Sequence, residues 1–186
     1  DATTRAAVNE IIERGQDRGS WLLFAAGVNH AESVRDIVRE RGFSAEMISG
    51  ETPKLERSQI INDFRRGNIR CITNVNVLTT GFDAPGVDLI GMLRPTQSPG
   101  LFVQMVGRGM RVANGKEDCL LLDFAGNCER HGPVDRVKCA APGEAGDGEA
   151  PVKSCPECMT YVHAAVRICP DCGYEWPAPT PKISAR

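Results

Sequence analysis

Hydrophobic and polar positions follow two different periods along this chain. Short runs in which nearly every residue is apolar, such as WLLFAAG, stand between longer stretches where apolar residues recur every three or four positions. The runs predict strands that are buried on both faces, and the longer stretches predict helices with one packed face. The predicted strands cover residues 21–27, 43–49, 69–75, 87–93 and 117–124.

Start and stop signals place helices between these strands. Asn29 is a predicted N-cap, and Gly42 is a predicted helix stop. Two pairs of a capping side chain and a proline predict the starts of further helices. The resulting helices cover residues 3–15 and 30–41 and the segments that begin at Thr52–Pro53 and at Ser98–Pro99.

Strands that alternate with helices predict an α/β fold, a parallel sheet covered by helices on both faces. Ligands of such sheets bind outside the carboxyl ends of the strands, so the loops that leave the strands are candidate binding segments. One of them, NVNVLTTGFDAP, is longer than the two to six residues that are usual for such connections. The five loops cover residues 27–30, 49–52, 74–85, 94–99 and 123–127.

The segment QMVGRGMR, residues 104–111, combines cations with glycines. If it is helical, Gln104, Arg108 and Arg111 share one face at positions i, i+4 and i+7. Its two glycines each weaken a helix by roughly 1 kcal/mol relative to Ala, which indicates close approach of the backbone to another surface. Taken alone, the pattern also fits a solvated helix face, so its context has to decide.

Composition restricts the class of protein. The 186 residues carry a net charge of −2, so a nucleic acid would have to meet a local basic face. The cations are 17 Arg and only 5 Lys, and guanidinium suits a bidentate grip on phosphate. No apolar run approaches the roughly 18 residues of a membrane span, which predicts no membrane partner and a cytoplasmic protein. The start at Asp1, inside a predicted helix, suggests a piece of a longer chain.

Four of the eight cysteines form two knuckles, CPEC and CPDC. This spacing predicts a closed tetrahedral zinc site with four thiolate ligands, which is a structural site and favours a reducing compartment. The alternative for the four cysteines is a pair of disulfides. The ligands would be Cys155, Cys158, Cys169 and Cys172. Aromatic residues of the same module, Tyr161, Tyr174 and Trp176, either stack on single-stranded nucleic acid or form its small core.

The remaining cysteines are read differently. Cys71 and Cys119 are predicted to be buried members of strands. Cys128, His131 and Cys139 make an incomplete ligand set for a second metal. The predicted domains are residues 1–139 for the sheet domain, 140–153 for a flexible linker, 154–178 for the zinc ribbon and 179–186 for a tail.

No phosphate-binding GxxxxGK[ST] motif occurs in the chain. Its nearest approximation, ANGKE at residues 113–117, lacks the first glycine and the hydroxyl that would hold Mg²⁺. No Asp-Glu pair closes an apolar strand either. The chain by itself is therefore expected neither to bind ATP tightly nor to hydrolyse it.

TTGFDAP followed by QMVGRGMR resembles motifs V and VI in the second RecA-like domain of superfamily 2 helicases and translocases. The order of NVNVLTTGFDAP, RPTQSP, QMVGRGMR, GK and DFAGN is similar to the RadD-like bacterial and phage helicases, in which a zinc module follows that domain. The resemblance implies that Arg111 is the main arginine finger toward the γ-phosphate, that Arg108 is its companion and that Gln104 orients both. It also implies that the glycines approach the first ATPase domain.

The same resemblance assigns roles in the strand-exit loops. Gly81 would permit a turn, and Asp83 would accept from the ribose hydroxyls. Thr79 and Thr80 would contact nucleic-acid phosphates or couple the two sites. Further backbone contacts would come from Asn29, His30, Ser49 and Gly50, with Arg94 and Ser98 as weaker candidates. For Asn29 the alternative is a plain helix cap.

These expectations give a C-terminal half of an ATP-dependent superfamily 2 helicase or translocase. ATP and Mg²⁺ would be shared with an N-terminal RecA-like domain, and structural zinc would be bound separately. The other partner would be nucleic acid, DNA rather than RNA, in repair or recombination. The alternative is a non-enzymatic adaptor that binds nucleic acid or protein through zinc, with a degenerate motor domain.

Overall fold

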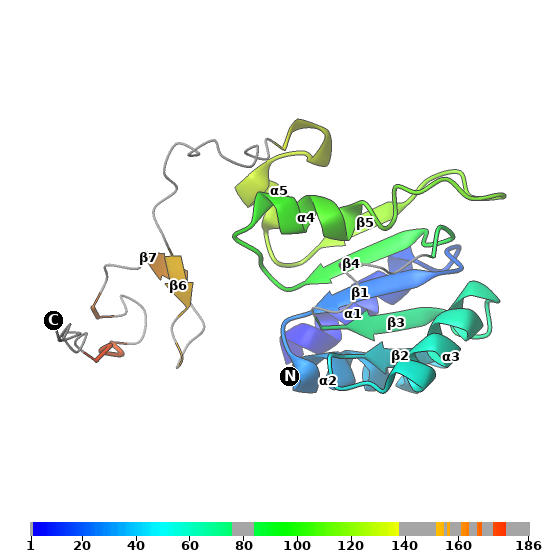
Figure 1. Ribbon diagram of the computed structural model, residues 1–186, viewed down its shortest axis with the longest axis horizontal. Coiled ribbons are helices and arrows are strands. Elements are labelled where there is room, and N and C mark those ends of the chain that lie inside the picture. Colours follow the sequence, from blue (N-terminus) through cyan, green and yellow to red (C-terminus); the bar gives the residue numbers. More distant parts are fainter. Residues whose placement is uncertain are drawn as a thin grey trace, which may run out of the picture. The chain divides into compact units, whose positions relative to one another are not determined.

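Five short strands form one parallel sheet in the computed structural model (Figure 1). The structure describes residues 2–75, 84–137, 152–154, 156, 161–163, 167–168 and 173–177. The predicted parallel sheet is confirmed, although its strands are shorter than the apolar runs. They are β1 (Trp21–Ala25), β2 (Ala45–Ile48), β3 (Cys71–Asn74), β4 (Leu89–Leu93) and β5 (Leu120–Asp123), in the spatial order β2-β3-β1-β4-β5.

Helices cover both faces of this sheet, as the sequence predicts. The helices are α1 (Ala2–Arg14), α2 (Val28–Glu40), α3 (Lys54–Arg65), α4 (Pro99–Val106) and the short α5 (Asn127–His131), followed by a 3₁₀ turn, η1 (Val134–Arg136). In β1, Trp21 and Leu23 pack with α1 and α2, whereas Leu22 and Phe24 pack with α3 and α4. Because both faces of β1 are buried, its sequence is apolar without alternation.

The helix ends confirm some of the predicted caps and correct others. Ser98 is the N-cap of α4, its Oγ accepts from Leu101 N at 3.2 Å, and a proline follows it. Gly42 ends α2 in the left-handed region at φ +86°. Asn29 is not an N-cap, because α2 already begins at residue 28 after Gly27. Thr52 does not cap α3 either, because its hydroxyl accepts from Ser49 N and Pro53 takes the N-cap position.

The parallel strands give the sheet two functionally different edges. The carboxyl edge holds the exits of β1 and β2, residues 26–30 and 49–53. The amino edge holds the segments that enter β4 and β5, residues 84–88 and 107–119. Figure 1 shows all five strands pointing the same way, with the segment between α4 and β5 extending past their amino ends. These two edges organise the candidate site.

The chain divides into two compact units, Asp1–Cys139 and Ala140–Arg186. In the second unit, β6 (Val152–Ser154) pairs antiparallel with β7 (Tyr161–His163), and Ile168 bridges to Glu175. The rings of Tyr174 and Trp176 meet edge to face, with centroids 5.2 Å apart. Within the described residues, no helix combines the length and apolarity that crossing a bilayer requires.

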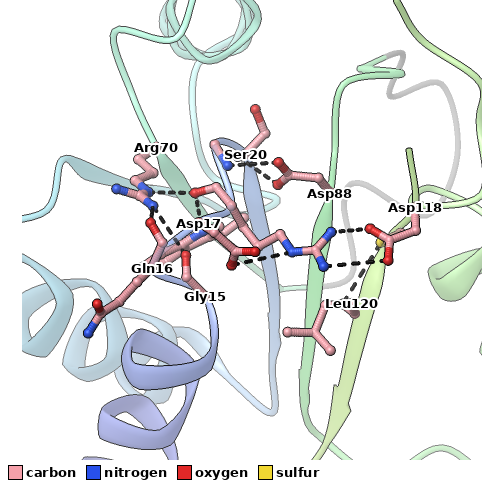
Figure 2. A network of polar contacts seen from close by, with 12 residues as sticks. Gly15, Gln16, Asp17, Ser20, Arg70, Asp88, Asp118 and Leu120 are labelled. Carbon is pink, nitrogen blue, oxygen red and sulfur yellow. Dashed lines mark hydrogen bonds and ion pairs between the residues drawn. The ribbon is translucent and has the colours of Figure 1, made fainter. Parts of the chain in front are cut away.

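Arg70 holds the turn between α1 and β1 at the amino edge (Figure 2). Its Nε donates to the carbonyl of Arg18 at 2.8 Å, and its Nη2 donates to the carbonyls of Gly15 and Gln16 at 3.1 and 2.6 Å. The guanidinium also lies over the ring of Trp21, 4.8 Å from its centroid. Because one cation satisfies the carbonyls that follow α1, it fixes the turn between α1 and β1 against the start of β3.

Arg70→Met is expected to lower the free energy of unfolding by about 2–4 kcal/mol, because three carbonyls lose a charged donor and two of these bonds are partly buried. Urea denaturation followed by circular dichroism measures the change. The matched control is Arg41→Met, since Arg41 is exposed at the end of α2 and should matter by about 0.5 kcal/mol or less. Equal losses in the two variants would contradict the role assigned to Arg70.

Candidate functional site

The exit of β1 presents the first turn of α2 at the carboxyl edge. Gly27 is extended, with φ −162°, and its carbonyl accepts from Ala31 N at 2.9 Å, which starts the helix. Asn29 is exposed in this first turn. The N–H groups of a first helical turn lack partners within the helix and favour anions. Asn29 and the start of α2 therefore form a surface suited to a phosphate.

His30, from the same turn, is used inside the domain. Its Nδ1 accepts from Ala26 N at 3.3 Å, and its Nε2 lies 3.4 Å from Thr4 Oγ1 of α1. A backbone N–H can only donate, so Nδ1 carries the lone pair and Nε2 carries the proton. Partial burial lowers the pKa of His30, which favours this neutral tautomer. The ring thus fixes the exit of β1 against α1.

The exit of β2 is a tight turn held by an arginine that sequence reasoning missed. Ser49 is buried, its N–H donates to Thr52 Oγ1 at 2.9 Å, and its Oγ accepts from Glu51 N at 3.3 Å. Arg57 of α3 donates through Nη2 to the carbonyls of Ser49 and Thr52, both at 3.1 Å. Gly50 at the tip is exposed, with open space where a side chain would lie. The turn therefore offers exposed backbone at a fixed position.

At the opposite edge, α4 ends earlier than the sequence pattern predicts. Its last residue is Val106, and Gly109 N closes the final turn on the carbonyl of Val106 at 2.9 Å. Gln104 is exposed on the helix, Arg108 lies in the turn that follows, and Arg111 is exposed beyond it. The prediction of one helical stripe carrying all three side chains is therefore wrong.

Ligand contacts are expected at the carboxyl ends of the strands, but both arginines lie at the opposite, amino edge. Because α4 starts at the exit of β4 and runs back along the sheet, its end lies at the amino edge (Figure 1). Arg108 and Arg111 follow that end, in the segment that leads into β5. The expectation that strand exits at the carboxyl edge gather the whole site is thus corrected. The described candidates divide between two edges.

Gly109 packs closely against other parts of this domain. A Cβ at this position would overlap with Cys119 Sγ and would lie 2.8 Å from Ile90 Cδ1. The close approach predicted from the glycines is real, but for Gly109 the opposing surface belongs to this domain. Cys119 itself is half-buried just before β5 and not within the strand, and burial raises the pKa of its thiol to about 11. Cys71, at the start of β3, is fully buried as predicted.

Ion pairs tie the arginine-bearing segment to the rest of the amino edge (Figure 2). Arg18, just before β1, contacts Asp118 through both guanidinium ends and lowers the pKa of that carboxyl group. Asp88, at the entry of β4, accepts from the N–H groups of Gly19 and Ser20 at 2.7 and 2.8 Å. The entries of β1, β4 and β5 are therefore linked in a continuous polar network.

A recess lies beside this network. It has a volume of about 270 Å³, and Ala84, Pro85 and Gly86 form one wall, with Ser20, Phe64 and Arg65 on the other sides. These three wall residues follow the TTGFD sequence directly. Thr79, Thr80, Gly81 and Asp83 themselves lie outside the described residues, as do Cys155, Cys158, Cys169 and Cys172.

No group of three or more metal-binding side chains occurs among the residues that the structure describes. Of the incomplete second ligand set, Cys139 lies outside them. His131 is engaged elsewhere, since its Nε2 donates to the carbonyl of Thr96 at 2.7 Å and its ring stacks on Phe102. In the described part of the chain, the candidate ligand-binding groups are therefore cationic side chains and backbone N–H groups.

A family model described as the helicase conserved C-terminal domain matches residues 3–113. The chain belongs to this family. A similar protein is the one named as mitochondrial ATP-dependent helicase irc3 of Schizosaccharomyces pombe, which is 40% identical over 134 residues. The match covers 70% of this chain and 22% of that protein, so the chain spans about a fifth of the relative.

Solved structures of helicases share the fold. The Escherichia coli DEAD-box protein SrmB aligns with a TM-score of 0.60 at 15% identity, over 72% of this chain and 79% of that one, which supports the fold alone. The Mycobacterium smegmatis helicase Lhr, described as bound to ssDNA and AMP-PNP, aligns with a TM-score of 0.53 at 25% identity. That alignment covers 62% of this chain and 16% of Lhr. The RecA-like architecture expected from the motifs is confirmed.

The lowered pKa of His30 makes part of the stability pH-dependent. The unfolded chain takes up a proton on this ring near its ordinary pKa of about 6.5, whereas the folded domain resists it. Stability is therefore expected to be complete above about pH 6.5 and to fall as the pH drops through the lower pKa of the folded state.

Urea unfolding of the parent and of His30→Gln between about pH 8 and pH 5 measures this component. The variant should start less stable because it loses the contacts of the ring. Its stability should then decline less steeply with acidification than that of the parent. Parallel declines would show that His30 is not the group that titrates.

Proposed function

We propose that this chain is the second motor domain of an ATP-dependent superfamily 2 helicase or translocase that acts on DNA. The family and the fold are those of helicase C-terminal domains. The observation that carries the proposal is the division of the described site residues between two edges of one sheet. Exposed arginine lies at one edge, and exposed backbone lies at the other.

The amino edge would complete the nucleotide site. Hydrolysis of ATP builds negative charge on the transferred phosphoryl group, and a cation held there lowers the barrier. Arg111 would act as the main finger and Arg108 as its companion, with Gln104 orienting them. Asp83, assisted by the turn at Gly81, would accept from the ribose. Support for this arrangement comes from the exposure of Arg111 and from the recess lined by the residues that follow Asp83.

The carboxyl edge would hold the nucleic-acid backbone. The first turn of α2 offers N–H groups to phosphates, and the turn between β2 and α3 offers the exposed backbone of Gly50. Such contacts position a strand without reading its sequence. Asn29, Ser49 and Gly50 belong to these turns, and Thr79 and Thr80 would add hydroxyls. His30 would act by holding its turn, given that its ring contacts Ala26 and Thr4.

The proposed helicase would need further components besides the described sheet domain. ATP and Mg²⁺ would be shared with an N-terminal RecA-like domain, because the chain has no phosphate-binding loop of its own. The four cysteines of the CPEC and CPDC knuckles would hold one structural zinc. DNA is favoured over RNA by the similarity to Lhr, which is described as bound to ssDNA. The RadD-like order of motifs favours a cytoplasmic role in DNA repair or recombination.

The domain would work through a closing cleft. ATP bound between the two motor domains would contact the amino edge of this one and stabilise the closed state. Hydrolysis would remove that contact and release it. A strand held at the carboxyl edge would move with the domain, so the rigid sheet would transmit the change from one edge to the other.

Arg111→Ala is expected to lower DNA-stimulated ATP hydrolysis by about 10³-fold or more in a protein that joins this chain to its first motor domain. The reason is the loss of the charge that stabilises the phosphoryl group in the transition state. A coupled assay of ADP release measures the rate, and binding of labelled single-stranded DNA should change little.

Arg41→Ala is the matched control, because Arg41 is an exposed arginine that the proposal gives no role. An Arg111→Ala variant that folds and hydrolyses ATP at the parental rate would contradict the finger assignment. A parent that binds DNA and zinc but hydrolyses no ATP would instead support the non-enzymatic adaptor.

A further inference from the structure

Lys116 directs its ammonium group into main-chain oxygens of the amino edge. Its Nζ donates to the carbonyl of Pro85 at 3.3 Å, to the carbonyl of Arg111 at 2.8 Å and to the carbonyl of Gly109. An ammonium group has three N–H donors, so these three acceptors use all of them. The side chain is half-buried in this position.

The three acceptors come from two segments far apart in the sequence. Pro85 belongs to the wall of the recess that enters β4, whereas Gly109 and Arg111 belong to the loop after α4. The helical ladder has ended by then, at the bond from Gly109 N to the carbonyl of Val106. The Gly109 and Arg111 carbonyls lie on either side of exposed Met110, so one cation fixes the backbone on both sides of that residue.

Gly115 gives the chain the turn that brings Lys116 back. It lies in the left-handed region at φ +77°, and Lys116 N donates to the carbonyl of Ala113 at 3.2 Å. Residues with a side chain rarely adopt this conformation. Gly115 and Lys116 do not form a phosphate-binding motif, but together they stabilise this loop. Glycine makes the turn, and lysine closes the loop.

We propose that Lys116 is a positioning residue for ATP hydrolysis, a clasp that holds the arginine loop of residues 107–111 against the segment that follows Asp83. This inference rests on the proposed function, because Lys116 can position an arginine finger only if Arg111 acts as one. A charge that acts on a transition state must be held to within a fraction of an ångström. Lys116 would supply that constraint from outside the nucleotide site.

A direct contact between Lys116 and a phosphate is the competing role for a lysine in such a place. The two roles differ in kinetics. A clasp affects where Arg111 stands in the transition state, so its loss lowers kcat while KM for ATP stays near the parental value. A phosphate ligand contributes to ground-state binding as well, so its loss raises KM.

The test uses the protein in which this chain follows its first motor domain. Lys116→Met keeps an unbranched side chain of similar length and removes every donor. It is expected to lower kcat at saturating DNA by about 10- to 100-fold, with KM for ATP and DNA affinity within about twofold of the parent. Lys54→Met is the matched control, because Lys54 is exposed at the start of α3 and should leave kcat unchanged.

A double-mutant cycle asks whether Lys116 acts through Arg111. Added to Arg111→Ala, Lys116→Met should lower kcat by less than about twofold further, since the main finger that it positions is already absent. If the two substitutions lowered kcat by the product of their separate effects, Lys116 would act independently of Arg111, and the proposed positioning role would be overturned. Parental kcat in Lys116→Met, or a raised KM with unchanged kcat, would overturn it as well. A parental rate in Arg111→Ala would instead overturn the proposed function itself.

Gly115→Ala keeps the lysine and disturbs only its approach, which covers the case in which Lys116→Met fails to fold. Alanine is strained at this φ, so the clasp should loosen and kcat should fall severalfold. Gly67→Ala is its matched control, because Gly67 has φ +78° and open space around it but no part in the loop. A kcat that falls equally in both glycine variants would contradict the proposal.

Discussion

The direction of the parallel strands is the constraint on which the rest of this structure depends. Each strand exits at the carboxyl edge, and the helices α2, α3 and α4 return the chain from there to the amino edge. Residues just after strands and residues just after helices therefore lie on opposite sides of one rigid sheet. The turns around Asn29 and Gly50 follow strands, whereas Arg108 and Arg111 follow a helix. In the proposed motor domain, this separation would let nucleotide and nucleic acid contact different surfaces.

Much of the fold was predictable because a strand that is buried on both faces has a continuous run of apolar residues. The apolar runs at Trp21–Ala25 and Leu89–Leu93 could only be interior strands, and Ser98 with Pro99 marked a helix start correctly. Thr52 and Asn29 failed as caps for local reasons. The hydroxyl of Thr52 accepts from Ser49 N, and the chain after Gly27 was already helical before Asn29. Such competition between neighbouring acceptors is decided by geometry that periodicity does not carry.

The candidate site residues stand in recognisable motifs, but the motifs do not give the position of the arginines on the sheet. The rule that ligands bind at the carboxyl ends of strands describes strand exits, whereas Arg108 and Arg111 follow a helix. The helix α4 ends at Val106, and Gly109 then packs on Cys119 and Ile90, a contact between residues distant in the sequence. Arg57 and Lys116 escaped notice because an arginine on a helix and a lysine after a glycine usually face solvent. Both side chains donate to main-chain carbonyls, and because every residue has a carbonyl, no sequence motif identifies these acceptors.

The proposed function requires that one sheet present nucleotide contacts at its amino edge and nucleic-acid contacts at its carboxyl edge. Amide hydrogen exchange, in a protein that joins this chain to its first motor domain, measures both edges at once. A non-hydrolysable ATP analogue should slow exchange in residues 84–88 and 107–119, and single-stranded DNA should slow it in residues 26–30 and 49–53. Protection of the same edge by both ligands, or of the carboxyl edge by the nucleotide, would contradict the account.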